Sequence, residues 1–328
     1  MQVGNDDAQD PLVQIRHFLS TTTCYDAMYD SSTLIILEAN LLLIFGAEKL
    51  IKYALLGIPV VENGIFKALL GTNDILLLMH YFYHNSTRMQ ANEALLSFSI
   101  ADVFELKRPS GLQYLNVSLH PDVSLLTAAK VILENNQFRA AIIDIEPNEK
   151  SPFILNYLPD KTLNVKGDHC ILSVITNYRI LRAIAINCSR IDTLNVPAKQ
   201  LMTIPQFTAK METPIISAIE MLISSGVNAI PILDDEGRVI NIYGSPDILQ
   251  FVADHDDLNL DLTIEHAISK RSAQFEGVHT CKEVDTLGYL LQGFKQQSVH
   301  RILVADENLK LLGVVRLVDI VRYLVYQE

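Results

Sequence analysis

The pattern of apolar and polar positions repeats four times along the chain. Each copy has an amphipathic helix, a short apolar strand that ends in an acidic residue, a second strand, and a polar residue that begins another helix. The strand ends fall at residues 59–62, 141–144, 231–234 and 303–306, and the closing helices begin at Asp74, Arg179, Asp247 and Asp319. Self-similarity at a fixed period is typical of a repeat architecture. The pattern therefore predicts an α/β (α+β) fold built from four βαββα units.

The repeats divide the chain into predicted segments. Residues 1–14 are polar and acidic, and we expect them to form a disordered lead-in. The second repeat holds a long polar insertion at residues 146–167, which indicates a surface excursion or a functional loop. A chain of 328 residues is long enough for two domains, and two pairs of repeats would supply them. The repeats are predicted at residues 15–90, 112–190, 198–256 and 270–328.

Composition and charge exclude several classes of protein. Hydrophobic residues make up 49% of the chain and charged residues 20%, which is typical of a globular core. The net charge of −12 argues against binding to nucleic acid or to an anionic membrane. The longest apolar stretch, residues 41–47, is far shorter than the roughly 20 residues that span a bilayer. We expect a soluble protein of the cytoplasm, with the nucleus left open as a second location.

Cysteines and catalytic motifs add little. Cys24, Cys170, Cys188 and Cys281 are widely spaced and include no C-x-x-C pair, which predicts reduced thiols. No cluster of histidines and cysteines stands out at ligand spacing, so we expect no metal site and no cofactor. The chain also lacks a phosphate-binding Walker loop, a dinucleotide-binding glycine motif and a nucleophile elbow. We therefore expect that the protein is not an enzyme.

Two groups of polar residues are candidates for ligand binding, and each has an ordinary structural interpretation. The aspartates at the helix starts could cap their helices, or they could accept the hydroxyls of a ribose. Arg139 and the pair His300-Arg301 stand at the start of strands that should be buried. A charge entering a buried strand is unfavourable unless it meets an anion, and arginine binds phosphate with two hydrogen bonds. A solvated arginine, or an ion pair with Asp306, would explain the same residues.

The unit that closes at residues 313–319 resembles the cystathionine-β-synthase (CBS) domain, which pairs into a Bateman module. Longer segments resemble the gamma subunit of the AMP-activated/sucrose-non-fermenting protein kinase in its fungal form, and the resemblance extends over about residues 15–327. The expected architecture is four CBS repeats that form two Bateman modules in a flat disc. The segments that carry the resemblance are residues 18–26, 171–181, 187–188, 271–278 and 299–301.

The resemblance implies a non-catalytic subunit that binds AMP, ADP or ATP between its repeats. Its expected partners are a catalytic alpha subunit and a scaffold beta subunit of a heterotrimeric kinase. The acids expected on ribose are Asp74, Asp247 and Asp319, with Arg179 in that place in the second repeat. The basic residues expected on phosphate are Arg139, His300 and Arg301. Other expected pocket positions are Val117, Thr176, Thr203, Asn228, Ala229, Gly244, Ser245, Arg271 and Arg316, of which Val117 and Thr176, like Asp74 and Arg179, are the weaker candidates.

Several residues depart from the family pattern. Leu56 stands where animal members have an arginine, and Phe138 where they have a histidine. Gly71 and Gly244 replace hydroxyl residues, and Arg316 could either fill the fourth site or bind its phosphate. These departures favour an alternative in which the chain is a structural CBS scaffold that has lost nucleotide sensing. If nucleotides bind, we expect at most two sites, the best of them between the third and fourth repeats.

Overall fold

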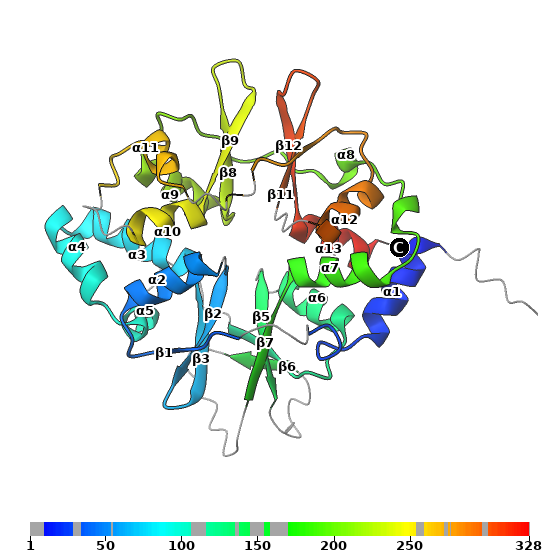
Figure 1. Ribbon diagram of the computed structural model, residues 1–328, viewed down its shortest axis with the longest axis horizontal. Helices are drawn as coiled ribbons and strands as arrows, with labels where there is room; N and C mark the ends of the chain where they lie inside the picture. The colour runs from blue at the N-terminus through cyan, green and yellow to red at the C-terminus, as the bar shows by residue number, and fades with distance from the viewer. Residues whose placement is uncertain are drawn as a thin grey trace, which may run out of the picture.

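The four repeats surround a common centre in a computed structural model of the chain (Figure 1). Two hairpins lie side by side on one edge, two on the opposite edge, and helices cover both flanks. No helix in the described part of the chain is long and apolar enough to cross a membrane. The structure describes residues 10–28, 34–53, 55–105, 116–134, 138–144, 154–157, 170–253, 259–271, 275, 277–296 and 301–327.

The first repeat follows the predicted βαββα order. β1 pairs in parallel with β2, and β2 pairs antiparallel with β3. Asn63 and Gly64 form the turn between β2 and β3, and both have positive φ angles. Its elements are β1 (Leu37–Glu38), α2 (Leu43–Lys52), β2 (Gly57–Glu62), β3 (Ile65–Gly71) and α3 (Thr72–Asn85), followed by α4 (Arg88–Ser97) and α5 (Ile100–Glu105).

The second repeat has an additional strand within the predicted surface excursion at residues 146–167. This strand, β6 (Ile154–Tyr157), pairs antiparallel with β4 at the edge of a sheet ordered β6-β4-β5-β7. The segment is therefore not simply a loop, and the rest of it lies outside the described residues. The other elements are β4 (Asn116–Leu119), α6 (Leu125–Glu134), β5 (Arg139–Asp144), β7 (Cys170–Thr176) and α7 (Asn177–Asn187).

The third and fourth repeats copy this order. In the third, a parallel bridge between Ala209 and Ile232 takes the place of the first strand. The connecting elements are η2 (Ile191–Thr193), α8 (Ala198–Leu201) and α11 (Ile264–Ser269). The third repeat comprises α9 (Ile215–Ser225), β8 (Ala229–Leu233), β9 (Val239–Gly244) and α10 (Ser245–Ala253), and the fourth comprises β10 (Thr280–Cys281), α12 (Leu287–Gln296), β11 (Arg301–Ala305), β12 (Leu311–Arg316) and α13 (Leu317–Tyr326).

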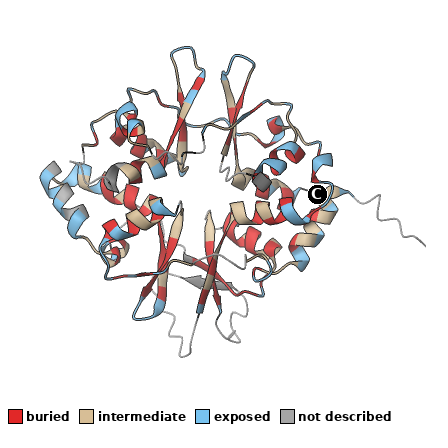
Figure 2. Cartoon of the chain, viewed as in Figure 1, coloured by how far each residue is buried: buried red, intermediate tan, exposed pale blue. Residues whose placement is uncertain are grey.

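Two kinds of hydrophobic core close the ring. Small cores join the sheets of repeats one and two, and those of repeats three and four. Large cores join the helices the other way: α2 and α3 pack with α9 and α10, whereas α6 and α7 pack with α12 and α13. Figure 2 shows buried positions on these facing helices and strands, and exposed positions at the hairpin tips. Each repeat therefore contacts one neighbour through its sheet and another through its helices.

Helix α1 (Pro11–Thr21) corrects the prediction of a disordered lead-in over residues 1–14. The Asp10 carboxylate accepts a hydrogen bond from a backbone amide of the first turn, and proline occupies the first helical position, where its missing N–H has no effect. Ile15 and Leu19 are fully buried in the core that joins repeats two and four. The beginning of the predicted first repeat therefore packs against other repeats. Residues before Asp10 lie outside the described part of the chain.

Candidate functional site

A cavity of about 700 Å³ lies where the four repeats meet. Its wall consists of strand ends and helix starts from every repeat, together with the linker at residues 203–207. Within the described part of the chain, no aspartate or glutamate lines it, although the net charge of the protein is −12. Cationic side chains gathered without acidic neighbours create a local positive potential. Five arginines line the cavity: Arg139, Arg179, Arg182, Arg301 and Arg316.

Arg139 lies in a slot formed by two glycines of the first repeat. Gly57 and Gly71 are directly opposite each other in β2 and β3, and a Cβ added to either would lie well inside 3.0 Å of the Arg139 guanidinium group. Glycine at both positions therefore permits the close approach. Burial lowers the pKa of Arg139, whereas the nearby Asp74 carboxylate raises it. An arginine from repeat two thus lies against the strands of repeat one, close to Asp74.

Arg301 has the equivalent position in the other half of the ring. It begins β11 and reaches the third repeat, where a Cβ added to Gly244 would lie 3.2 Å from its Nη1. Gly244 is opposite Ala229 in the β8–β9 hairpin, so small residues again form the slot. The sequence prediction paired Arg139 with Arg301, and the structure places both at the same point of their modules. His300 lies outside the described residues.

The three helix-opening aspartates all cap their helices. Asp74 accepts a hydrogen bond from the Gly71 amide at 2.7 Å, and Asp247 accepts one from the Gly244 amide at 2.9 Å. Asp319 accepts one from the backbone amide three residues before it, at 3.1 Å. Each carboxylate is at the third helical position and bonds back to the residue before the helix, as in a capping box. The aspartates therefore do cap their helices, but from the third helical position and not as the N-cap residues that accept first-turn amides.

Asp247 has a second partner in Arg271. The Arg271 Nε and Nη2 atoms donate to the two oxygens of Asp247 at 2.7 and 2.9 Å. The side chains of Arg271 and Asp247 are only 9% and 11% exposed. Arg271 also donates to the Ile242 carbonyl oxygen at 2.6 Å, and its guanidinium carbon lies 3.8 Å from the ring centre of Phe275. This pair forms one wall of a second cavity of about 230 Å³, which Arg301 also lines.

Arg316 and Arg179 also have partners inside the protein. The Arg316 Nε and Nη2 atoms donate to the Asp319 carboxylate at 2.8 and 2.7 Å, and this contact raises the pKa of Arg316. Arg179 donates through Nη1 to the Ser173 hydroxyl, and its backbone amide donates to the Thr176 hydroxyl at 3.2 Å. Arg316 thus fills the place beside Asp319, and both arginines still reach the wall of the central cavity.

The remaining predicted positions lie in four kinds of place. Thr203, Asn228 and Ala229 line the central cavity, and Gly244 lines the second one. Ser245 is fully buried, and its hydroxyl donates to a backbone carbonyl oxygen of the adjacent hairpin. Val117 corrects the prediction: it is 2% exposed and belongs to the core of repeats two and four. It therefore packs in the interior and lines neither cavity.

Sequence reasoning missed two contributions to the central cavity. Arg182 follows Arg179 by three positions on α7, so the two side chains lie on the same face of the helix. That spacing was a signal in the sequence. The linker at residues 203–207 also lines the cavity, and no local pattern indicates this because the linker's position depends on how the two halves of the chain pack.

Comparisons with known proteins agree with this geometry. A family model described as the CBS domain matches residues 198–254 and 275–326, which are the third and fourth repeats. The 5'-AMP-activated protein kinase subunit gamma of Kluyveromyces lactis is 30% identical over 321 residues, covering 96% of this chain and 92% of that protein. The chain belongs to the AMP-activated protein kinase gamma subunit family. The Saccharomyces cerevisiae subunit gamma is also 30% identical, over 94% of this chain and 92% of its own length.

The family extends to animals, and the fold extends further. The pig gamma-3 subunit is 27% identical over 98% of this chain and 60% of that protein. A solved structure from Methanocaldococcus jannaschii, presented as a candidate archaeal homologue of the gamma subunit, aligns with a TM-score of 0.66. The alignment covers 92% of this chain and 99% of the archaeal one at 15% identity, so it supports the fold alone. The sequence-based assignment to the gamma subunit family is confirmed, and the CBS domain is confirmed in the third and fourth repeats.

Proposed function

We propose that this gamma family member is the non-catalytic regulatory subunit of a heterotrimeric Ser/Thr protein kinase, and that it binds AMP, ADP or ATP between its CBS repeats. The observation that carries the proposal is the convergence of five arginines on the central cavity without an acidic residue among its described lining. Phosphate groups require such cations because the chain as a whole is acidic and repels anions. Arginine adds bidentate hydrogen bonds to phosphate oxygens.

The size and the other walls of the cavity suit a nucleotide. Pockets that bind small molecules typically measure about 300–1,000 Å³, and this one measures about 700 Å³. The arginines come from repeats two and four, whereas Leu55, Leu56 and Val227 supply apolar surface from repeats one and three. This division favours a nucleotide orientation in which the phosphate chain contacts the arginines and the base contacts the apolar wall. Leu56, which replaces the arginine of animal members, would then contact the base rather than a phosphate.

The structural scaffold remains a second candidate because two ribose acceptors are already engaged. Arg271 binds both oxygens of Asp247, and Arg316 binds both oxygens of Asp319. A ribose at either site would share or displace these arginines. Under this alternative, the chain assembles the kinase and its ring of repeats has a purely structural role.

The partners follow from the family and not from the contacts within the chain. The yeast relatives are named as gamma subunits of the AMP-activated protein kinase, so we propose that a catalytic alpha subunit and a scaffold beta subunit bind this chain in the cytoplasm. Co-expression of the three chains and purification as a stable 1:1:1 complex would test the assembly. A gamma chain that elutes alone in the presence of both partners would contradict it.

Calorimetry on the purified full chain tests nucleotide binding directly. Titration with AMP, ADP and ATP should show saturation at one or two nucleotides per chain. Three or more bound nucleotides, or none at millimolar concentration, would overturn the proposed site count. If a nucleotide binds but leaves the kinase activity of the complex unchanged, the scaffold is the correct description of the function.

A further inference from the structure

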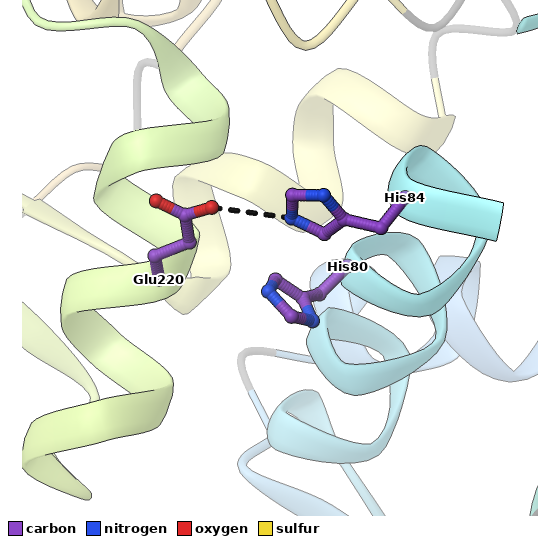
Figure 3. Close-up of side chains that lie close together, drawn as sticks. All are labelled: His80, His84 and Glu220. Carbon is purple, nitrogen blue, oxygen red and sulfur yellow. Dashed lines mark hydrogen bonds and ion pairs between the residues drawn. The ribbon is translucent and has the colours of Figure 1, made fainter.

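Two histidines and a glutamate lie close together (Figure 3), and none of the three lines the central cavity. His80 and His84 are four positions apart on α3, so their imidazoles lie on the same face of the helix. Glu220 projects toward them from α9, and its Oε1 lies 3.2 Å from the His84 Nε2. One nitrogen or oxygen atom from each of the three side chains lies within 4.8 Å of the other two.

The two helices hold these side chains on a rigid base. α3 belongs to repeat one and α9 to repeat three, and the helices pack against each other. Met79, which precedes His80, and Ile219, which precedes Glu220, are 1% and 0% exposed in the core that joins these repeats. Because the core fixes both backbones, little conformational freedom remains to be lost on binding, which is the condition for a preorganised site.

We propose that His80, His84 and Glu220 bind a divalent transition-metal ion, with Zn²⁺ as the best match, and that the ion links repeat one to repeat three. Imidazole nitrogen and carboxylate oxygen are zinc ligands, and two histidines with one glutamate form a known zinc set in which a fourth position stays open to water. Copper and nickel accept the same nitrogen ligands, so the choice among these ions is part of the test.

The distances agree with a site that needs only side-chain adjustment. Tetrahedral coordination with bonds of about 2.0–2.1 Å places ligand atoms roughly 3.3 Å apart. His84 and Glu220 are already at 3.2 Å, so the remaining change is a rotation of His80 toward the pair. Beside the cluster, the Tyr83 hydroxyl donates to Asp261 at 2.6 Å. That hydrogen bond ties α3 to the segment before α11 and keeps Asp261 engaged outside the proposed ligand set.

A simpler account is that His84 and Glu220 form an ion pair and no metal binds. Both side chains are 46% exposed, and exposed ion pairs contribute only about 0–1 kcal/mol. An ion pair uses His84 alone, whereas the metal requires His80 as well. The contribution of His80 to metal binding therefore separates the two accounts.

The test uses the full-length chain after treatment with a chelator. We expect calorimetry with Zn²⁺ to show one ion per chain, Co²⁺ to give the visible absorption of a four-coordinate site, and Zn²⁺ to raise the melting temperature. His80→Gln, His84→Gln and Glu220→Gln should each weaken Zn²⁺ binding by roughly tenfold or more, because each removes a direct ligand. His17→Gln is the matched control, since His17 is exposed on α1.

Circular dichroism of the metal-free variants shows whether each is folded before the titration. Zn²⁺ affinity that is unchanged in a folded His80→Gln variant would overturn the proposal, and so would the absence of Zn²⁺ binding by the unaltered chain at about 100 μM. Binding that weakens equally in His17→Gln would also overturn it, because the ion would then not be held by this cluster.

Discussion

Arg271 holds Asp247 through two parallel hydrogen bonds, from Nε to Oδ1 at 2.7 Å and from Nη2 to Oδ2 at 2.9 Å. Arg271 makes two further hydrogen bonds: Nη1 donates to the Asn241 side-chain oxygen, and Nη2 donates to the Ile242 carbonyl oxygen. The carboxylate that the sequence offers for a ribose therefore also serves as the anchor of the segment that enters repeat four. A nucleotide that used Asp247 would bind beside Arg271 or compete with it.

Arg271→Ala should destabilise the protein strongly, because it leaves the nearly buried Asp247 carboxylate without its cation. We expect the free energy of unfolding to fall by about 3–5 kcal/mol, the range for breaking a buried pair, as measured by urea denaturation. In an Asp247→Asn background the same substitution should have a clearly smaller effect, because contacting residues are not additive. Equal effects in both backgrounds would show that the two residues are not coupled.

Arg301→Ala should weaken nucleotide binding by about 1.5–3 kcal/mol, the scale of a hydrogen bond to a charged group. The reason is that Arg301 borders both cavities. Calorimetry of the folded variant provides the measurement. Arg238→Ala is the control, since Arg238 is an exposed residue that pairs with Asp234 at a hairpin turn and lines neither cavity. Unchanged affinity in Arg301→Ala would remove Arg301 from the site.

Two glycines of helix α12 should respond in opposite directions to alanine. A Cβ on Gly288 would lie 2.4 Å from the Ile191 carbonyl oxygen and 2.9 Å from the Asp192 carbonyl oxygen. Nothing lies within 4 Å of a Cβ on Gly293. Backbone cannot move as a side chain can, so Gly288→Ala should reduce stability by about 1–3 kcal/mol. Gly293→Ala should be neutral or stabilise by up to about 1 kcal/mol, because alanine favours the helix. Thermal denaturation of both variants decides; a harmless Gly288→Ala would contradict the close packing.

Thiol labelling should find one reactive cysteine in the native protein. Burial raises the pKa of Cys24 and Cys281 to about 12 and that of Cys188 to about 11, and the thiolate is the reactive form. These three thiols should stay protonated and slow to react up to about pH 9, whereas the exposed Cys170 should react at once. Cys170→Ser should abolish the fast phase. A fast phase that persists in that variant would show that one of the buried thiols is accessible.

The sequence predicts the repeats well because their pattern is local. Alternation of apolar positions identifies the strands and helices, and the acidic end of each strand marks a turn whatever lies beyond it. Helix α1 shows the limit. Its own residues indicate an amphipathic helix, but its burial against repeats two and four depends on the path of the whole chain. The strand β6 was missed because the polar residues around it give no strand pattern.

The residues of the candidate site also divide into those with a local sequence signal and those whose position depends on tertiary packing. Arg139 and Arg301 could be predicted because a cation at the start of a buried strand is unusual by itself. The partners of Arg271 could not be predicted, because Asp247 lies 24 positions away in sequence and the connection between them sets the geometry. The approach of Glu220 to the two histidines is tertiary as well. The sequence led to no expected metal site: the four-residue spacing of His80 and His84 puts them on one face of α3, but nothing local indicates that a carboxylate faces them.

The crossed arrangement of the cores has a consequence for synthesis. When only the first two repeats have left the ribosome, α2 and α3 lack their partners α9 and α10, and α6 and α7 lack α12 and α13. The nascent half therefore displays apolar helix faces that only the second half can cover, and transiently exposed surface of this kind promotes aggregation. Contacts between segments far apart in sequence also form slowly. The core of repeats one and three can form only after the third repeat is made, and the core of repeats two and four only after the fourth. The first two repeats therefore cannot complete their cores as a separate module.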